Sequence, residues 1–262
     1  KRARVMFVGS TARDTGLKGD KDIDLFVSFP HDRTKDEIVR DTVDTVKAVL
    51  PAKWEMHYAE HPYLQGVIGN FKVEVIPCYR IGEHQPVISA VDRTPLHMNY
   101  LQEKLSLKQR RDVRVLKKLL KAHRIYGAEL EIEGFSGLVC EYLVLRYGSL
   151  EKLMAAGAQW KPPVVIDSHA SAPEEELKAR FPNALVLIDM IDRNRNAAAA
   201  ISDTSVSKFI ALCRAFLKKP SEKFFFPTQR PVQLPAISAA FRKRMHLIVL
   251  KMGLPRNIVS DI

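Results

Sequence analysis

The 262-residue sequence lacks any run of about 18 consecutive apolar residues, the length that a membrane-spanning helix needs, so we expect no membrane segment. Cysteine is scarce: Cys78, Cys140 and Cys213 are odd in number, far apart and set in apolar segments. This arrangement argues against a disulfide framework or a zinc site and predicts buried thiols in a reducing cytoplasm. Low-complexity tracts and internal repeats are also missing, and 46% of the residues are hydrophobic, so bulk disorder is excluded.

The sequence starts without a methionine, and its first residues do not resemble a signal peptide. It begins with KRARVMFV, in which the apolar stretch is too short for a secretory signal and indicates a buried strand. At the other end, a lone strand candidate at residues 246–251 is followed only by a few residues, although an isolated strand needs partners. We therefore expect a chain that is truncated at both ends, and a cytoplasmic location.

Acidic residues are too few to balance the basic ones: 41 Lys and Arg stand against 30 Asp and Glu, for a net charge of +11. Such a surplus favours a polyanionic partner such as a nucleic acid, although a basic protein without one is an alternative. The charge is concentrated at residues 104–124, which hold nine Lys or Arg and a single Asp. Apolar residues at helical spacing there predict a helix with one apolar stripe and a broad basic face.

Two patterns of apolar residues divide the chain. The first hundred residues predict mixed α/β structure, with a helix at residues 34–50 and strands at residues 4–9, 22–29, 54–58, 64–68 and 71–76. Gly69 and Asn70 predict a hairpin turn between the last two strands. From residue 89 to about residue 216 the pattern is mostly helical, with short strand candidates at residues 164–167 and 184–189.

Two aspartates one residue apart mark the second strand. Because side chains alternate along a strand, Asp22 and Asp24 point to the same face. Adjacent carboxylates repel each other unless a cation bridges them, and oxygen ligands suit Mg²⁺, yet such a pair alone is more often a solvent-facing pair on an edge strand. Glu74, which shares a strand face with Lys72, adds a third carboxylate. Three carboxylates on neighbouring strands can close a two-metal site for phosphoryl transfer.

The segment before the aspartates has the residues that a phosphate-binding loop needs. Gly9 allows a tight turn, Ser10 is expected to cap a following helical turn, and Arg13 offers a bidentate contact to a phosphate. Gly-Ser alone is a weak signal. The whole order of elements is a much more specific signal: a strand, then Gly-Ser, then Asp-x-Asp starting at Asp22, twelve residues after Ser10, and later Val-Glu-Val.

The segment VMFVGSTARDTGLKGDKDIDLFVSF matches the general nucleotidyltransferase pattern hG[GS], [DE]h[DE]h and h[DE]h, where h is apolar. Over nearly the whole chain, the sequence more closely resembles the archaeal (class I) CCA-adding tRNA nucleotidyltransferases, through YAEHPYLQGVI, VEVIPCYR, SAVDRTPLHMNYL, RVLKKLLKAHRIYGAE and GFSGLVCEYLVLRYGS. The resemblance implies an α+β fold: a polymerase-β-like head with a mixed or antiparallel sheet (1–103), a mostly helical neck (104–217) and the start of an incomplete body or tail domain (218–262).

The resemblance also assigns residues. It places the metal carboxylates at Asp22, Asp24 and Glu74, the triphosphate loop at Ser10 and Arg13, further nucleotide-binding positions at His97, Lys117 and Tyr126, and a base-reading arginine at Arg195. The third carboxylate is usually Asp in the archaeal branch, so Glu74 is a departure. Each of the last four positions also has an alternative without a function: His97 as a packed histidine, Lys117 as a solvated lysine, Tyr126 as a tyrosine at a helix end and Arg195 as an arginine in a polar loop.

The resemblance implies the addition of C, C and A to the 3′ end of tRNA from CTP and ATP, with Mg²⁺ and without a template. The basic helix would contact acceptor-stem phosphates, and a homodimer is compatible with the sequence. Two alternatives stay open: another template-independent enzyme of the superfamily, such as a poly(A) polymerase or an oligonucleotide synthetase, and a non-catalytic RNA-binding module.

Overall fold

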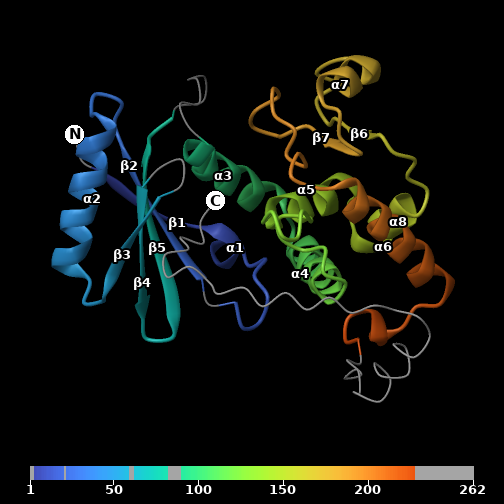
Figure 1. Cartoon of the computed structure of the whole chain (residues 1–262), viewed down its shortest axis with the longest axis horizontal. Helices are drawn as coiled ribbons and strands as arrows, with labels where there is room; N and C mark the ends of the chain where they lie inside the picture. The colour runs from blue at the N-terminus through green and yellow to red at the C-terminus, as the bar shows by residue number, and fades with distance from the viewer. Residues whose placement is uncertain (1–2, 21, 59–61, 82–89, 228–262) are drawn as a thin grey trace, which may run out of the picture.

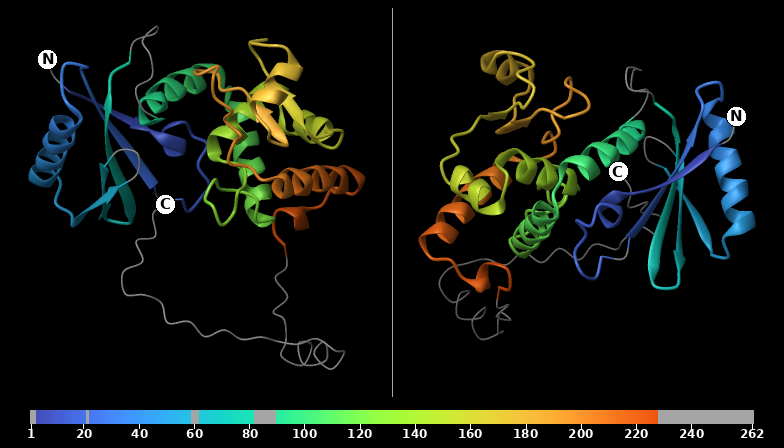
Figure 2. Two further views of the ribbon diagram at one scale, coloured as in Figure 1. Left: turned by 45° about the horizontal axis from the view of Figure 1, so that its top comes forward. Right: turned by 180° about the vertical axis from the view of Figure 1, so that it is seen from behind.

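The computed structural model describes residues 3–20, 22–58, 62–81 and 90–227 (Figure 1). A sheet with one long helix forms one part of the molecule, and a helical part follows it in the chain, as Figure 2 shows from two further sides. The α+β fold class is therefore confirmed. The strand expected at residues 246–251 and most of the segment 218–262 lie outside the described residues.

The sheet has the strand order β1-β2-β5-β4-β3. Its strands are β1 (Arg4–Val8), β2 (Asp22–Phe29), β3 (Trp54–Tyr58), β4 (Pro62–Ile68) and β5 (Phe71–Tyr79). β2 and β5 run parallel and the other neighbours are antiparallel, so the sheet is mixed. The turn predicted between β4 and β5 is confirmed, and Gly69 adopts a φ of 62° there, in the left-handed region that favours glycine.

Apolar residues on the two faces of the sheet pack against different helices. On one face, α2 (Lys35–Val49) begins with a capping box made by Thr34 and Glu37 and packs Val46 against Val73 and Val75 of β5. On the other face, residues of the sheet pack with Met98 of α3 (Arg93–Lys104). α3 follows the short 3₁₀ turn η1 (Ala90–Asp92). By strand alternation, the second face also carries Asp24 and Glu74.

The helical part follows α3 and has its own large core. Its elements are α4 (Leu107–Ala122), α5 (Gly137–Tyr147), α6 (Leu150–Gly157), β6 (Val164–Ile166), α7 (Glu174–Arg180), β7 (Leu185–Leu187), α8 (Asp203–Lys218) and η2 (Glu222–Phe224). β6 and β7 pair in parallel, which confirms the two short strands expected in this region.

The basic helix expected at residues 104–124 is shorter than predicted. The chain breaks at Leu105, and α4 begins only at Leu107 because Ser106 caps it through a capping box with Gln109. The three cysteines are buried free thiols, as predicted. No helix in the described part of the chain is long and apolar enough to cross a membrane.

Candidate active site

The three predicted carboxylates lie on two adjacent parallel strands. Asp24 of β2 is the register partner of Glu74 of β5, and Asp22 is the partner of Lys72. Asp22 is exposed, whereas Asp24 and Glu74 are half-buried. The alternation of side chains along β2 and the parallel register together bring two of the three carboxylates opposite each other, with the third two residues away.

Negative charge at this position is only partly compensated. The pKa of Asp24 is raised to about 6, first by burial and then by the charges of Glu74 and Asp22, while Arg13 and Lys72 act in the opposite direction. Glu74 Oε1 lies 2.9 Å from Lys72 Nζ. As their side chains stand, no three acidic, histidine or cysteine residues in the described ranges form a closed metal-binding group. The donor set nevertheless fits a divalent cation, since its oxygens are those that Mg²⁺ prefers and a cation relieves the repulsion around Asp24.

Gly9 brings the loop after β1 into close contact with Asp24. Its φ is 78°, and a Cβ at this position would lie 1.9 Å from Asp24 Oδ2. The loop turns through the short α1 (Gly9–Ala12), and Thr11 Oγ1 donates a hydrogen bond of 2.9 Å to the carbonyl oxygen of Asp22. The expectation that Ser10 caps this turn is wrong, because Ser10 lies inside α1 and Val8 occupies the N-cap position without a side-chain hydrogen bond.

A cavity of about 370 Å³ opens next to the carboxylates. Its lining joins the loop, the sheet and the start of α3, through Gly9, Asp24, Glu74, Tyr63 and Thr94 among others. The space is large enough for part of a nucleotide and lies directly beside the acidic side chains. Small-molecule sites are commonly built in this way, with a few polar groups around a concave space.

Arg13 is buried and faces the helical part of the molecule. Its Nε lies 3.0 Å from Glu141 Oε1 and its Nη2 lies 3.0 Å from Glu141 Oε2, which makes a bidentate ion pair with α5. The hydroxyl of Thr15 donates to the same carboxylate. Glu141 is fully buried. In this arrangement the guanidinium of Arg13 is directed to Glu141, a partner that no pattern in the sequence indicates.

One stripe of α4 holds the loop between α1 and β2. Arg110 donates to the carbonyl of Arg13, Arg114 forms an ion pair of 2.7 Å with Asp14, Lys117 donates to the carbonyl of Thr15, and Lys121 pairs with Asp20. These four basic residues recur at helical spacing and so share one face. Other basic residues of α4, namely Lys108, Arg111 and Lys118, are exposed on its remaining surface.

Lys117 and Tyr126 both lie close to Gly137, at the start of α5. Lys117 is only 1% exposed, and its Nζ lies 3.0 Å from the carbonyl oxygen of Thr15. Burial lowers the pKa of this lysine, and the charge of Glu141 acts against that effect. A Cβ on Gly137 would lie 3.4 Å from Lys117 Nζ and 3.5 Å from the Tyr126 hydroxyl. The structure therefore brings Lys117 and Tyr126 together.

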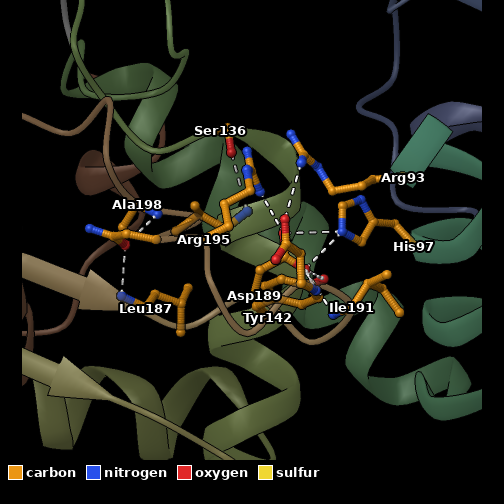
Figure 3. Close-up of polar contacts among 12 residues, drawn as sticks. Arg93, His97, Ser136, Tyr142, Leu187, Asp189, Ile191, Arg195 and Ala198 are labelled. Atoms are coloured by element: carbon orange, nitrogen blue, oxygen red, sulfur yellow. Dashed lines mark hydrogen bonds and ion pairs between the residues drawn. The ribbon is translucent and has the colours of Figure 1, made fainter. Parts of the chain in front are cut away.

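His97 and Arg195 lie on either side of one carboxylate, Asp189, which the sequence analysis missed (Figure 3). His97 Nε2 lies 2.9 Å from Asp189 Oδ1, and Arg195 Nη1 lies 2.5 Å from Asp189 Oδ2. Asp189 lies two residues after the end of β7 and is fully buried. The one signal in the sequence was an ionisable residue at the end of the apolar segment ALVLID, because a buried carboxylate needs partners.

Two family models match the chain, one on each part. Residues 1–97 match the nucleotidyltransferase domain, and residues 111–226 match the second domain of tRNA nucleotidyltransferases. Both matches, in chain order, agree with the resemblance found in the sequence. The chain belongs to the tRNA nucleotidyltransferase family.

Curated members of this family from archaea are similar over most of the chain. A CCA-adding enzyme from Pyrobaculum neutrophilum is 43% identical over 229 residues, which cover 87% of this chain and 54% of the relative. One from Methanococcus maripaludis is 38% identical over 271 residues, covering 98% and 60%, and one from Halobacterium salinarum is 43% identical over 243 residues, covering 93% and 52%. The chain thus spans little more than half the length of these relatives.

Solved structures share the fold. The Cid1 poly(U) polymerase has a TM-score of 0.66 at 13% identity, with 85% of this chain and 86% of that chain covered. The mtPAP structure with bound UTP has a TM-score of 0.57 at 11% identity, with 86% and 62% covered. At these identities the likeness concerns the fold alone, and it supports the polymerase-β-like fold expected for this chain.

Proposed function

We propose that the full-length protein adds C, C and A to the 3′ end of tRNA from CTP and ATP and releases pyrophosphate. The observation that carries this proposal is the juxtaposition of Gly9 with Asp24 and Glu74, in a chain that belongs to the tRNA nucleotidyltransferase family. A loop that touches a pair of carboxylates beside a cavity is the arrangement that phosphoryl transfer requires. Positioning and charge stabilisation account for most of the catalysis in such reactions.

Asp22, Asp24 and Glu74 are the residues that would hold Mg²⁺, which, when bound, supplies charge neutralisation for the phosphates and lowers the pKa of the tRNA 3′-hydroxyl. In the reaction, the 3′-hydroxyl loses its proton to water, its oxygen bonds to the α-phosphorus, and the bond from the α-phosphorus to pyrophosphate breaks. Lys72, which is ion-paired with Glu74, keeps part of the acidic charge compensated before substrates bind.

The remaining nucleotide contacts in this proposal come from the loop after β1 and from the helices. Ser10 and Arg13 of the loop, with Lys117 and Tyr126 near the start of α5, would lie around the triphosphate. His97 and Arg195 would face the nucleoside, and a guanidinium offers a fixed fork of donors that suits the acceptor atoms of a base. The exposed basic residues of α4 would contact tRNA phosphates.

We further propose that residues 1–103 form the catalytic head, residues 104–217 the neck and residues 218–262 the start of a body or tail domain. The cytoplasmic location and the compatibility with a homodimer stay predictions. They follow from the sequence and from the proposed tRNA substrate.

The proposal is tested with a tRNA that lacks its last three nucleotides. The full-length protein is offered each nucleoside triphosphate singly, and then CTP together with ATP, in the presence of Mg²⁺. Three additions confined to C and A support the proposal. Long A tails would indicate another polymerase of the superfamily, and the absence of any addition would indicate an RNA-binding module.

A further inference from the structure

Asp189 is a fully buried carboxylate between two residues that our proposed function places at the nucleotide (Figure 3). It contacts His97, which comes from α3, and Arg195, which comes from the loop after β7. The first contact spans 92 residues of sequence. A carboxylate is removed from water at a large cost unless its partners compensate it, so these partners indicate what Asp189 does.

The hydrogen bonds of Asp189 leave no room for a ligand. It accepts from His97 Nε2 (2.9 and 3.1 Å), the Tyr142 hydroxyl (3.1 Å), the amides of Ile191 (2.9 Å) and Asp192 (3.4 Å), and Arg195 Nη1 (2.5 Å). A carboxylate has about four lone-pair sites, and the five donors use them all. Asp189 therefore fits neither the role of a metal ligand nor that of a group that contacts substrate.

The charge of Asp189 is held in place by the same partners. Burial alone would raise the pKa of this carboxyl, but the hydrogen bond and charge of His97, together with the Ile191 amide and Arg195, hold the pKa well below its usual range. Asp189 stays ionised at neutral pH and cannot serve as a proton carrier there.

Arg195 is anchored at one nitrogen and open at the others. Its side chain is 35% exposed, and within the described part of the chain its guanidinium has Asp189 as its one hydrogen-bond partner, through Nη1. A guanidinium is planar with five donors in fixed directions, so holding one nitrogen also restricts where the remaining donors point. A pre-oriented donor set loses less entropy when it binds a partner.

We propose that Asp189 is a positioning residue: it fixes the guanidinium of Arg195 and thereby the discrimination between bases in the nucleotide site. This inference rests on the proposed function, because that function places Arg195 at the base. Arg195 would recognise the edge of cytosine or adenine that carries hydrogen-bond acceptors. Another base would leave donors of the guanidinium unpaired, which disfavours its binding.

A purely structural role for Asp189 predicts a different effect of its substitution on nucleotide discrimination. Asp192, in the same loop, offers a control. Asp192 Oδ2 lies 3.1 Å from Arg93 Nη1, so Asp192 also ties α3 to the loop after β7. In the described part of the chain, no hydrogen bond or ion pair joins the Asp192 side chain to Arg195; only the Arg195 amide donates to the Asp192 carbonyl oxygen, at 3.0 Å. If tying α3 to this loop were the only role of Asp189, then Asp189→Asn and Asp192→Asn would have the same kind of effect on nucleotide discrimination.

The test measures binding, so that it does not depend on addition. The full-length protein is bound to a tRNA that lacks its last three nucleotides and ends in a 3′-deoxy sugar, and Kd values are measured for CTP, UTP and GTP. We expect Asp189→Asn to reduce the discrimination of CTP against UTP and GTP at least tenfold, and Asp192→Asn to leave it within twofold of wild type. On an Arg195→Ala background, Asp189→Asn should add no further loss.

Three results would overturn the inference: unchanged discrimination in Asp189→Asn, independent and additive losses in the double variant, or equal binding of CTP and UTP by the wild-type protein. Failure of the proposed function is a separate result, in which the wild-type protein discriminates between bases but adds nothing to a tRNA with a 3′-hydroxyl.

A measurement on the wild-type protein avoids any folding defect of the variants. With ¹⁵N-labelled arginine, the Nη resonances of Arg195 should be separate and slowly exchanging, whereas a single averaged resonance would contradict the anchoring by Asp189.

Discussion

Arg13 and Glu141 form a buried bidentate ion pair that joins the loop after β1 to helix α5, across 128 residues of sequence. The pair fixes the position of the loop relative to the helical part of the molecule. Glu141 also lies near Lys117 and opposes the fall in its pKa that burial causes. Under the proposed function, these charged groups lie where the triphosphate would bind.

Glu141→Gln should lower the free energy of unfolding by about 3–5 kcal/mol, because it leaves the buried charge of Arg13 without its partner. Urea unfolding followed by circular dichroism measures this change. Glu174→Gln is the matched control, since Glu174 pairs with Lys178 at an exposed position, where such pairs contribute about 1 kcal/mol or less. Equal losses in the two variants would show that the Arg13 pair does not hold the loop.

Gly9→Ala should abolish most nucleotide addition, because the new methyl carbon would lie 1.9 Å from Asp24 Oδ2 and force this carboxylate to move. Gly19→Ala is the control: Gly19 also has a positive φ, of 100°, but a Cβ there meets nothing within 4 Å. Both variants carry backbone strain of about 1–2 kcal/mol. Addition rates at saturating CTP distinguish them, and a Gly9→Ala protein as active as Gly19→Ala would refute the close contact with Asp24.

Arg111→Ala should weaken tRNA binding and reduce the slope of log Kd against log salt by about one, because it removes one phosphate contact from the exposed face of α4. Arg114→Ala should leave the salt slope unchanged, since Arg114 is already paired with Asp14 in the loop. Filter binding between 50 and about 200 mM salt separates the two variants. The same slope change in both would mean that the two faces of α4 do not differ in their role.

The elements that the sequence predicted well depend on local patterns. The alternation in DIDLFVSF predicted which residues of β2 share a face, and Asp24 and Glu74 do lie opposite each other. The pairs Arg13–Glu141 and His97–Asp189 depend instead on how distant helices pack. The apolar neighbours of Glu141 in GLVCEYLVL and of Asp189 in ALVLID indicate that the two carboxylates are buried, but they do not identify their partners. The later start of the basic helix, at Leu107 and not at residue 104, has a local cause, because Ser106 and Gln109 form a capping box there.

Glu74 is the third carboxylate of the proposed metal site, at a position where the resemblance implies an Asp. Glu74→Gln should lower the rate of CMP addition by orders of magnitude, because the charge of a metal-binding carboxylate is lost. Glu74→Asp should retain measurable activity, since the charge survives and a water can bridge the missing methylene, whose length is about 1.5 Å. Rates are measured at saturating Mg²⁺, and a Gln variant within threefold of wild type would remove Glu74 from the site.

The most direct test of the account combines two measurements on Asp24→Ala: the single-turnover rate of CMP addition to a tRNA that lacks its last three nucleotides, and the Kd for the same tRNA. Asp24 lies between the loop and Glu74 and does not belong to the basic surface of α4. The account predicts that addition is abolished while the Kd for tRNA changes less than about threefold, which is under 1 kcal/mol. An Asp24→Ala protein that binds tRNA normally and still adds CMP at close to the wild-type rate would contradict it.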